Sequence, residues 1–287
     1  MTAMRAGPLH FGKGGGSLDD RSDLKGSGGM KLVSTKAVDA RDTAEWQARI
    51  DLAAAHRLAV IQGFSEGIFN HFTLAIPGRN DGFYLNPFGL HWSEVTASNL
   101  ITVSYDGRLL DGDGEIERSA FCIHAPIHRL KKQAACVLHT HMPYASALTR
   151  LEEPQIQAIG QTEIGFLDEI AYDDKYTGLA FDPAEGERLA GVLGDKSILF
   201  MANHGVLVCG ETVAKAYDRL YYLERACQVQ LYAMWTGKKL KQVPAAVVAR
   251  TVAQFDDSPV YGNKPAADHH FAALKRMLDR KEPDYVD

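Results

Sequence analysis

The sequence predicts an α/β protein of three layers, α/β/α, in which helices cover both faces of a central, mainly antiparallel sheet. Two long segments, 42–63 and 211–237, place apolar residues at helical spacing. Short β-rich runs alternate with turn residues over 72–112, and the apolar runs 135–141 and 197–210 are typical of buried strands. The chain has 287 residues, 46% of them hydrophobic, which is enough for the core of one large domain.

The N-terminal part of the chain comprises a tail and the first elements. Residues 1–30 are rich in Gly, Ser and Asp and lack apolar periodicity, so we expect a disordered tail. A helix begins after Asp42, a residue suited to an N-cap, and ends at Gly63. Antiparallel strands are expected in the runs "FTLAIPG", "GFYLNPFG" and "LITVSYDGRLLDG", where β-forming residues alternate with turn residues.

Helices and strands alternate over the rest of the chain. The expected elements are helices over 115–133, 183–194 and 211–236 and strands over 135–141 and 197–210. The first of these helices contains Pro126, and Gly237 ends the last. We assign 31–243 to one domain and 244–287 to a C-terminal extension that packs on the domain or on a neighbouring subunit.

Composition excludes several classes of function. The formal net charge is −5 and the basic residues are scattered, so nucleic acid is not an expected partner. No run reaches the roughly 18 apolar residues of a membrane helix, and the N-terminus lacks the apolar segment of a signal peptide. We therefore expect a cytoplasmic protein without a membrane partner. Its four cysteines are read as buried free thiols of a reducing compartment: Cys122, Cys136, Cys209 and Cys227.

Two histidines interrupt the apolar run 135–141. His139 and His141 are two residues apart, so on a strand their imidazoles project from the same face and can chelate a metal ion. For this pair alone, hydrogen bonding in the core is an equally good interpretation. His204 follows another apolar strand and precedes a glycine. Three histidines on two strands suit a tetrahedral site with one open position, the arrangement of catalytic zinc.

Longer motifs carry a resemblance to a known family. They are "GIFNHFTLAI", "YLNPFGLHWSEVTASNLI", "CIHAPIHRLKKQAACVLHTH" and "MANHGVLVCG". Together, over about 45–235, they resemble the class II aldolase/adducin family, and "NPFGLHWSEVTAS" is most similar to the adducin head domain. The resemblance implies an α/β/α fold with a central antiparallel sheet, and a homotetramer with active sites between subunits. It also implies a divalent metal on His139, His141 and His204. We expect Zn²⁺ first, with Mn²⁺, Fe²⁺, Co²⁺ or Ni²⁺ as alternatives.

The chain departs from the family's sugar-phosphate aldolases at residues that serve catalysis and phosphate binding. Ala120 occupies the position of their catalytic glutamate. Arg118 and Ser119 correspond to serines that help bind the substrate phosphate, and Phe88, beside Gly89, corresponds to a threonine of the phosphate loop. These replacements argue against cleavage of phosphorylated sugars in its usual form.

Other residues are candidates for the missing roles. Glu117 is nearly one helical turn before Ala120 and is a candidate acid or base, although a first-turn glutamate is also favoured by the helix dipole alone. Arg118 suits a carboxylate substrate, or is a solvated helix charge. His71 matches a substrate-facing asparagine of the aldolases and either contacts substrate or caps its strand by hydrogen bonding.

Histidines and tyrosines near the metal strand are also open to several interpretations. His124 and His128 are four residues apart on a predicted helix, a spacing that can bind metal, although we favour support or packing roles. In the family a tyrosine from a neighbouring subunit can donate a proton. Tyr172 is our candidate for that role, with Tyr144 and Tyr176 as alternatives.

Two functional hypotheses follow. The first is a metal-dependent carbon–carbon lyase, an aldolase or decarboxylase, acting on a small oxo or hydroxy acid through a metal-stabilised enediolate. Decarboxylation needs no base to start it, so it tolerates Ala120 better than aldol cleavage does. The alternative is a non-catalytic, adducin-like oligomerising module that retains the fold and the metal site. In the first case the partner is a small-molecule substrate that carries a carboxylate.

Overall fold

The computed structural model describes residues 44–256 and 265–287. An eight-stranded sheet has the order β4-β3-β2-β1-β5-β8-β7-β6. The strands are β1 (His71–Ala75), β2 (Gly82–Leu85), β3 (Ile101–Ser104), β4 (Leu109–Asp111), β5 (Cys136–Thr140), β6 (Ile170–Asp173), β7 (Ile198–Met201) and β8 (Val206–Gly210). All neighbours are antiparallel except β6 and β7, so the prediction of a mainly antiparallel sheet is confirmed.

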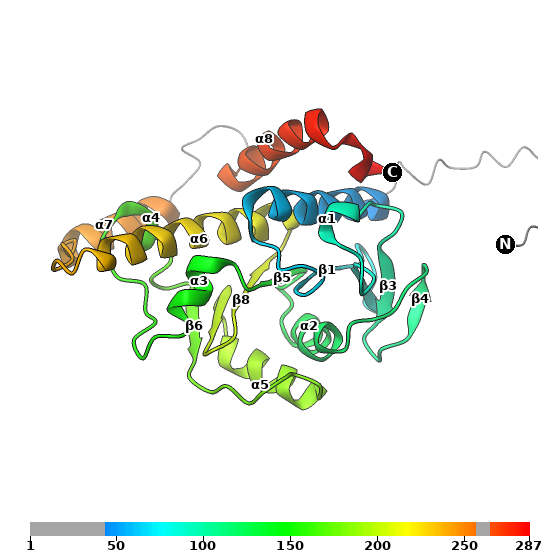
Figure 1. Ribbon diagram of the computed structural model, residues 1–287, viewed down its shortest axis with the longest axis horizontal. Helices are drawn as coiled ribbons and strands as arrows, with labels where there is room; N and C mark the ends of the chain where they lie inside the picture. The colour runs from blue at the N-terminus through cyan, green and yellow to red at the C-terminus, as the bar shows by residue number, and fades with distance from the viewer. Residues whose placement is uncertain (1–43, 257–264) are drawn as a thin grey trace, which may run out of the picture. The chain divides into compact units, whose positions relative to one another are not determined.

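Helices cover both faces of the sheet, which confirms the three-layer architecture (Figure 1). The α-helices are α1 (Ala44–Gln62), α2 (Arg118–Leu130), α3 (Pro143–Leu148), α4 (Gln161–Ile164), α5 (Pro183–Leu193), α6 (Val213–Trp235), α7 (Ala245–Asp256) and α8 (Ala266–Lys281). Short 3₁₀ turns are η2 (Trp92–Glu94) and η3 (Pro283–Val286). Helices α1 and α6 cover one face, and α2 and α5 cover the other.

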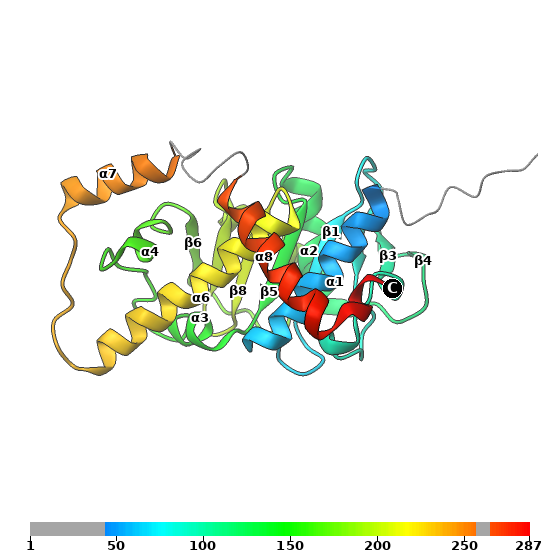
Figure 2. The ribbon, with the colours of Figure 1, turned by 90° about the horizontal axis from the view of Figure 1, so that it is seen from above.

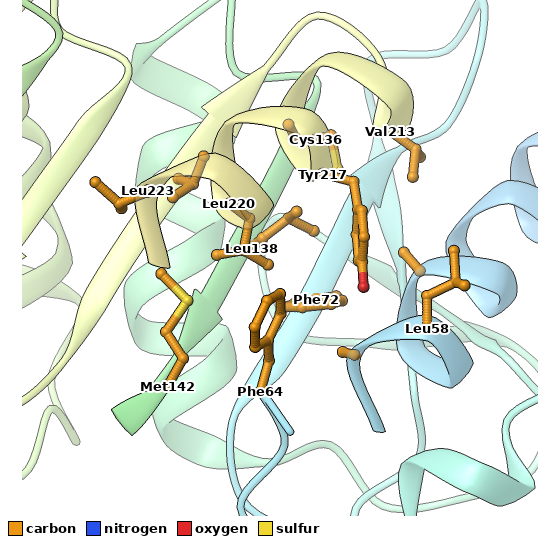
Figure 3. Close-up of a cluster of buried hydrophobic side chains, with 14 of the residues drawn as sticks. Leu58, Phe64, Phe72, Cys136, Leu138, Met142, Val213, Tyr217, Leu220 and Leu223 are labelled. Atoms are coloured by element: carbon orange, nitrogen blue, oxygen red, sulfur yellow. The ribbon is translucent and has the colours of Figure 1, made fainter. Parts of the chain in front are cut away.

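The alternation of side chains along β5 explains how the two layers form. Cys136 and Leu138 belong to the apolar core beneath α1 and α6, where Tyr217 and Leu220 of α6 face them (Figure 3). Val137 belongs to the opposite core, beneath α2 and α5. Because successive residues of a strand point to opposite faces, His139 lies on the same face as Val137. The predicted metal strand therefore presents its histidine toward α2.

Helix α2 shows how a proline is tolerated inside a helix. Pro126 has no N–H, so the carbonyl of Cys122 lacks its intrahelical donor. Gly186 of α5 packs directly on this turn, where a Cβ atom would lie 2.0 Å from the Cys122 oxygen and 2.9 Å from Pro126 Cγ. The absence of a side chain at Gly186 therefore permits the close approach of the two helices. The helix begins at Arg118, three residues later than the sequence predicted.

The C-terminal helix α8 lies across α1 and α6 (Figure 2). Phe271 and Leu278 are buried in the main core. Arg57 of α1 donates to Glu282 at 3.2 Å and to Asp284 at 2.8 Å, which fixes the end of the chain. The domain limits 31–243 and 244–287 remain predictions.

Three further sequence predictions concern the N-terminal tail, membrane-spanning helices and the cysteines. The tail 1–30 and the N-cap Asp42 lie outside the described residues. Within the described ranges, no helix combines the length and apolar character needed to cross a membrane. The four cysteines are free and buried, as predicted: Cys122, Cys136, Cys209 and Cys227.

Candidate metal centre

Three histidines meet at one end of β5. His139 lies in β5, His141 follows the end of that strand, and His204 lies in the turn between β7 and β8. One ring nitrogen from each can be chosen so that all lie within 4.8 Å of one another. The ring centroids are 4.8–5.1 Å apart. The structure thus brings together the three residues predicted as metal ligands.

The β7–β8 turn places His204 beside the other two. Asn203 adopts a left-handed conformation, with φ of 55°, and its N–H donates to the carbonyl of Thr149 at 2.8 Å. Gly205 packs against β5, where a Cβ atom would lie 2.6 Å from His141 Cδ2 and 2.6 Å from the Thr140 oxygen. The Asn-His-Gly sequence therefore combines a tight turn with a close approach to the metal strand.

Hydrogen bonds orient two of the imidazoles for metal binding. His139 Nδ1 donates to the Val206 carbonyl at 2.9 Å, and His141 Nδ1 donates to the carboxylate of Glu66. In each neutral ring the Nε2 lone pair is then available. His141 Nε2 is buried and has no hydrogen-bond partner among the described residues. A buried polar atom without a partner is costly, and a metal ion would satisfy it.

Burial also favours the neutral form that metal ligands require. It lowers the pKa of His139 well below its ordinary value. Burial, with the charges of His141 and Arg150 adding to it, lowers the pKa of His204 to about 4. The neutral forms of His139 and His204 therefore prevail near pH 7. Three imidazole nitrogen donors fit a divalent cation of the zinc type.

Two residues that were not predicted from the sequence support His141. Glu66 accepts the proton of His141 Nδ1, and the Asn70 side-chain oxygen accepts from the His141 backbone N–H at 3.2 Å. Asn70 has a left-handed φ of 72°, which asparagine tolerates better than most residues. The sequence contained one signal, an asparagine directly before His71 at the start of a strand. No local pattern connects Glu66 with a histidine 75 residues later.

Glu117 lies directly before α2, three residues before Ala120. It is the N-cap of α2, and its Oε2 accepts from the Ala120 N–H at 2.5 Å and from the Ser119 hydroxyl at 2.6 Å. The same oxygen is 3.9 Å from His71 Nε2. Ala120 itself is buried in an apolar cluster that includes Phe83. As the N-cap of α2, Glu117 therefore directs its carboxylate toward His71, although it lies nearly one helical turn before Ala120.

The residues predicted to bind substrate lie at and before the N-terminus of α2: Arg118 and Ser119 begin the helix, and the Phe88 N–H donates to the Glu115 carbonyl at 2.9 Å. The Arg118 side chain is exposed; its Nε donates to the Phe181 carbonyl at 3.1 Å, and its guanidinium lies over the Phe181 ring at 5.4 Å. Phe88 is 38% exposed and its ring is 6.4 Å from that of Phe69. Gly89 has a φ of 88°, which a side chain would disfavour. Among the described contacts, none joins Arg118 or Phe88 to the three histidines.

The three tyrosines lie in different environments. The Tyr172 hydroxyl accepts from the Ile156 N–H at 3.1 Å, and burial raises the pKa of this phenol. The Tyr144 hydroxyl is 2.6 Å from that of Tyr232. Tyr176 is 53% exposed and its ring centroid is 6.4 Å from that of His204. Of the three, Tyr176 is therefore the one in ring contact with the histidine cluster.

Arg150 is a further cation beside the cluster. Its charge contributes to the lowered pKa of His204. It lines a cavity of about 280 Å³ that also includes Tyr172 and Asn203. An arginine at the end of a short helix has no distinctive sequence pattern, so Arg150 was not predicted.

The fold agrees with the comparisons to known proteins. Residues 50–231 match the family model of the class II aldolase and adducin N-terminal domain. The chain belongs to this family, as the sequence motifs indicated.

Particular relatives come from both branches. A putative aldolase class 2 protein of Pseudomonas aeruginosa is 35% identical over 84% of this chain and 93% of its own length. Alpha-adducin of Rattus norvegicus is 31% identical over 75% of this chain, but the match covers 28% of that protein.

Solved structures share the fold. An aldolase II superfamily protein from Pseudomonas syringae has a TM-score of 0.79 at 37% identity, covering 87% of this chain and 99% of that one. L-fuculose 1-phosphate aldolase from Glaciozyma antarctica PI12 has a TM-score of 0.72 at 24% identity, and the match covers 84% of this chain and 92% of that one.

Proposed function

We propose that the protein is a divalent-metal-dependent carbon–carbon lyase, of the aldolase or decarboxylase type, that acts on a small oxo or hydroxy acid. The observation that carries the proposal is the convergence of His139, His141 and His204, with the buried Nε2 of His141 lacking a partner. Zn²⁺ is the proposed metal. A bound cation would supply Lewis-acid stabilisation of the negative charge that develops on substrate oxygens as the carbon–carbon bond breaks.

Side chains of the chain itself would bind substrate and move protons. Glu117 and His71 border the cluster on the α2 side, and Tyr176 borders it on the other. We assign substrate contact to His71 and proton transfer to Glu117 or Tyr176. Tyr172 is a weaker candidate because its hydroxyl is already engaged with the Ile156 N–H. Arg150 favours an anionic substrate, since its positive charge acts on the histidine cluster.

The alternative is a non-catalytic, adducin-like module. Ala120 favours it, because the side chain at the glutamate position is buried among apolar residues rather than available for chemistry. The similarity to alpha-adducin also favours it. Glu117 favours the lyase, because the cap of α2 holds its carboxylate 3.9 Å from His71 Nε2. We therefore place the lyase first.

The proposed assembly is a homotetramer in the cytoplasm. Helix α6 exposes large apolar side chains that suit burial against other subunits. Those that are more than two-fifths exposed are Tyr222, Val229, Tyr232 and Trp235. Four buried free thiols fit a reducing compartment. A monomeric mass by light scattering would contradict the tetramer.

The lyase is tested by incubating zinc-loaded protein with β-oxo acids and β-hydroxy carbonyl acids, and measuring release of CO₂ or aldehyde. We expect turnover that disappears in His204→Ala. His269→Ala, which changes an exposed histidine on α8, is the matched control and should retain it. Metal binding without turnover of any member of the panel would favour the non-catalytic module.

A further inference from the structure

A buried chain of hydrogen bonds connects the candidate site to the backbone beneath α2. His71 Nδ1 is 2.8 Å from His124 Nε2, and His124 Nδ1 is 2.6 Å from the Thr73 hydroxyl. That hydroxyl is 2.7 Å from His128 Nε2, and His128 Nδ1 is 2.8 Å from the carbonyl of Ala134. The five residues come from β1, α2 and the loop before β5.

The carbonyl at one end fixes the direction of every bond in the chain. A carbonyl only accepts, so His128 Nδ1 carries a proton and its Nε2 accepts one from Thr73. The Val137 carbonyl, 3.4 Å from the same hydroxyl, is a more distant acceptor for the single proton of Thr73. Whichever acceptor takes that proton, none is left for His124, so His124 Nδ1 must donate to Thr73. His124 Nε2 in turn accepts from His71 Nδ1. With neutral rings, His71 is left with a lone pair on Nε2.

Burial keeps the rings neutral. His71 is 4% exposed, and His124 is fully buried. Burial lowers the pKa of His128 to about 4. It lowers the pKa of His124 well below the ordinary value. The chain ends on a carbonyl that cannot accept a proton, so it orients the rings and does not conduct protons away from the site.

The bare nitrogen of His71 faces the candidate metal centre and a carboxylate. The His71 ring is 4.9 Å from that of His139, its direct cross-strand partner. Its Nε2 is 3.9 Å from Glu117 Oε2, beyond hydrogen-bond distance. The negative charge of Glu117 and the lone pair of His71 together repel a carbonyl or carboxylate oxygen. Both attract a group that donates a hydrogen bond.

We propose that His71 Nε2 is a specificity-determining acceptor that binds a hydroxyl group of the substrate. Thr73, His124 and His128 are positioning residues that hold His71 in the accepting tautomer. The inference rests on the proposed function, because it identifies the substrate as an acid that carries a hydroxyl beyond the atoms that would reach the metal. A hydrogen bond of this kind corresponds to about a three- to tenfold preference over the matching deoxy compound.

Neutron diffraction from crystals grown in D₂O tests the tautomers. We expect deuterium on His71 Nδ1 and none on His71 Nε2 in the wild type. Thr73→Ser keeps the hydroxyl and should show the same pattern. Thr73→Val keeps the shape but removes the hydroxyl, so the proton of His71 is free to move to Nε2, toward Glu117. Deuterium on Nε2 in the wild type, or an unchanged pattern in Thr73→Val, would overturn the inference.

Calorimetry with zinc-loaded protein tests the ligand class with glycerate and lactate, two 2-hydroxy acids that differ by one hydroxyl. Wild type and Thr73→Ser should bind glycerate about three- to tenfold more tightly than lactate, and Thr73→Val should reduce the ratio to below about twofold. If the wild type binds the two acids equally, or binds neither of them, the hydroxyl role is refuted. If the protein binds no metal, the proposed function fails, whereas the deuterium pattern still decides the tautomer inference.

Discussion

Removing the carboxylate of Glu66 should weaken metal binding without removing any metal ligand. Glu66 accepts the Nδ1 proton of His141 and so holds the Nε2 lone pair toward His139 and His204. A hydrogen bond to a charged group contributes about 1.5–3 kcal/mol. The Glu66 side chain is 58% exposed, so solvent screens its charge and the lower value applies.

We therefore expect Glu66→Ala to lower zinc affinity by about tenfold, the lower end of the range for residues that orient metal ligands. Glu66→Gln retains a neutral acceptor and should lose only about threefold. Competition with a chromophoric chelator measures both affinities. The control is Glu187→Ala, which removes an exposed carboxylate on α5. This variant should bind zinc as the wild type does. Wild-type affinity in Glu66→Ala would refute the idea that this carboxylate orients His141.

Two further predictions concern stability. Gly186→Ala should destabilise the protein by more than about 3 kcal/mol in urea unfolding, because the new Cβ would overlap the Cys122 carbonyl. Gly191→Ala in the same helix is the control: its Cβ would meet nothing within 4 Å, so the change should be neutral or stabilising by about 0.5–1 kcal/mol. Equal effects of the two changes would contradict the close packing of α2 and α5. Burial lowers the pKa of His56 to about 4. The unfolded chain then binds more protons than the folded one between pH 4 and 6.5, so the contribution of His56 is complete above pH 6.5 and is lost as the pH falls toward 4. In metal-free protein, His56→Gln should lose about 2 kcal/mol less than the wild type between pH 7 and pH 5, and identical losses would show that His56 does not carry this dependence.

The histidine cluster was predictable because it depends on short-range rules. The alternation of side chains along a strand puts His139 and His141 on one face, whatever the rest of the fold does. The glycine after His204 indicated a turn next to an apolar strand. Both features are local, so they can be predicted without knowledge of the tertiary structure. The apolar runs of β5, β7 and β8 were predictable for the same reason.

The surroundings of the triad depend on contacts between distant segments. Glu66 and His141 are 75 residues apart, and His71 and His124 are 53 apart. The sequence suggested metal binding or packing for His124 and His128, but did not suggest that both would bond the hydroxyl of Thr73. Such a network depends on how α2 is rotated over the sheet, which no local pattern specifies.

Long polar side chains were the hardest to place. Arg118 was expected either to bind a carboxylate substrate or to be a solvated helix charge. Its exposed guanidinium lies over Phe181, a contact that the sequence did not suggest. Many rotamers are open to such a side chain, and tertiary contacts select among them. Glu117 was anticipated at one helical turn from Ala120, but its direction toward His71 follows from its role as the cap of α2. The residue type indicated the chemistry, and the packing decided the position.

The most direct test of the account is the metal content of tag-free protein, measured by elemental mass spectrometry before and after dialysis against zinc. We predict about one divalent ion per chain in the wild type and a large loss in His139→Ala and His204→Ala, with His269→Ala unchanged. Wild-type protein that is free of metal and rebinds none would contradict the assignment of His139, His141 and His204 as a metal centre.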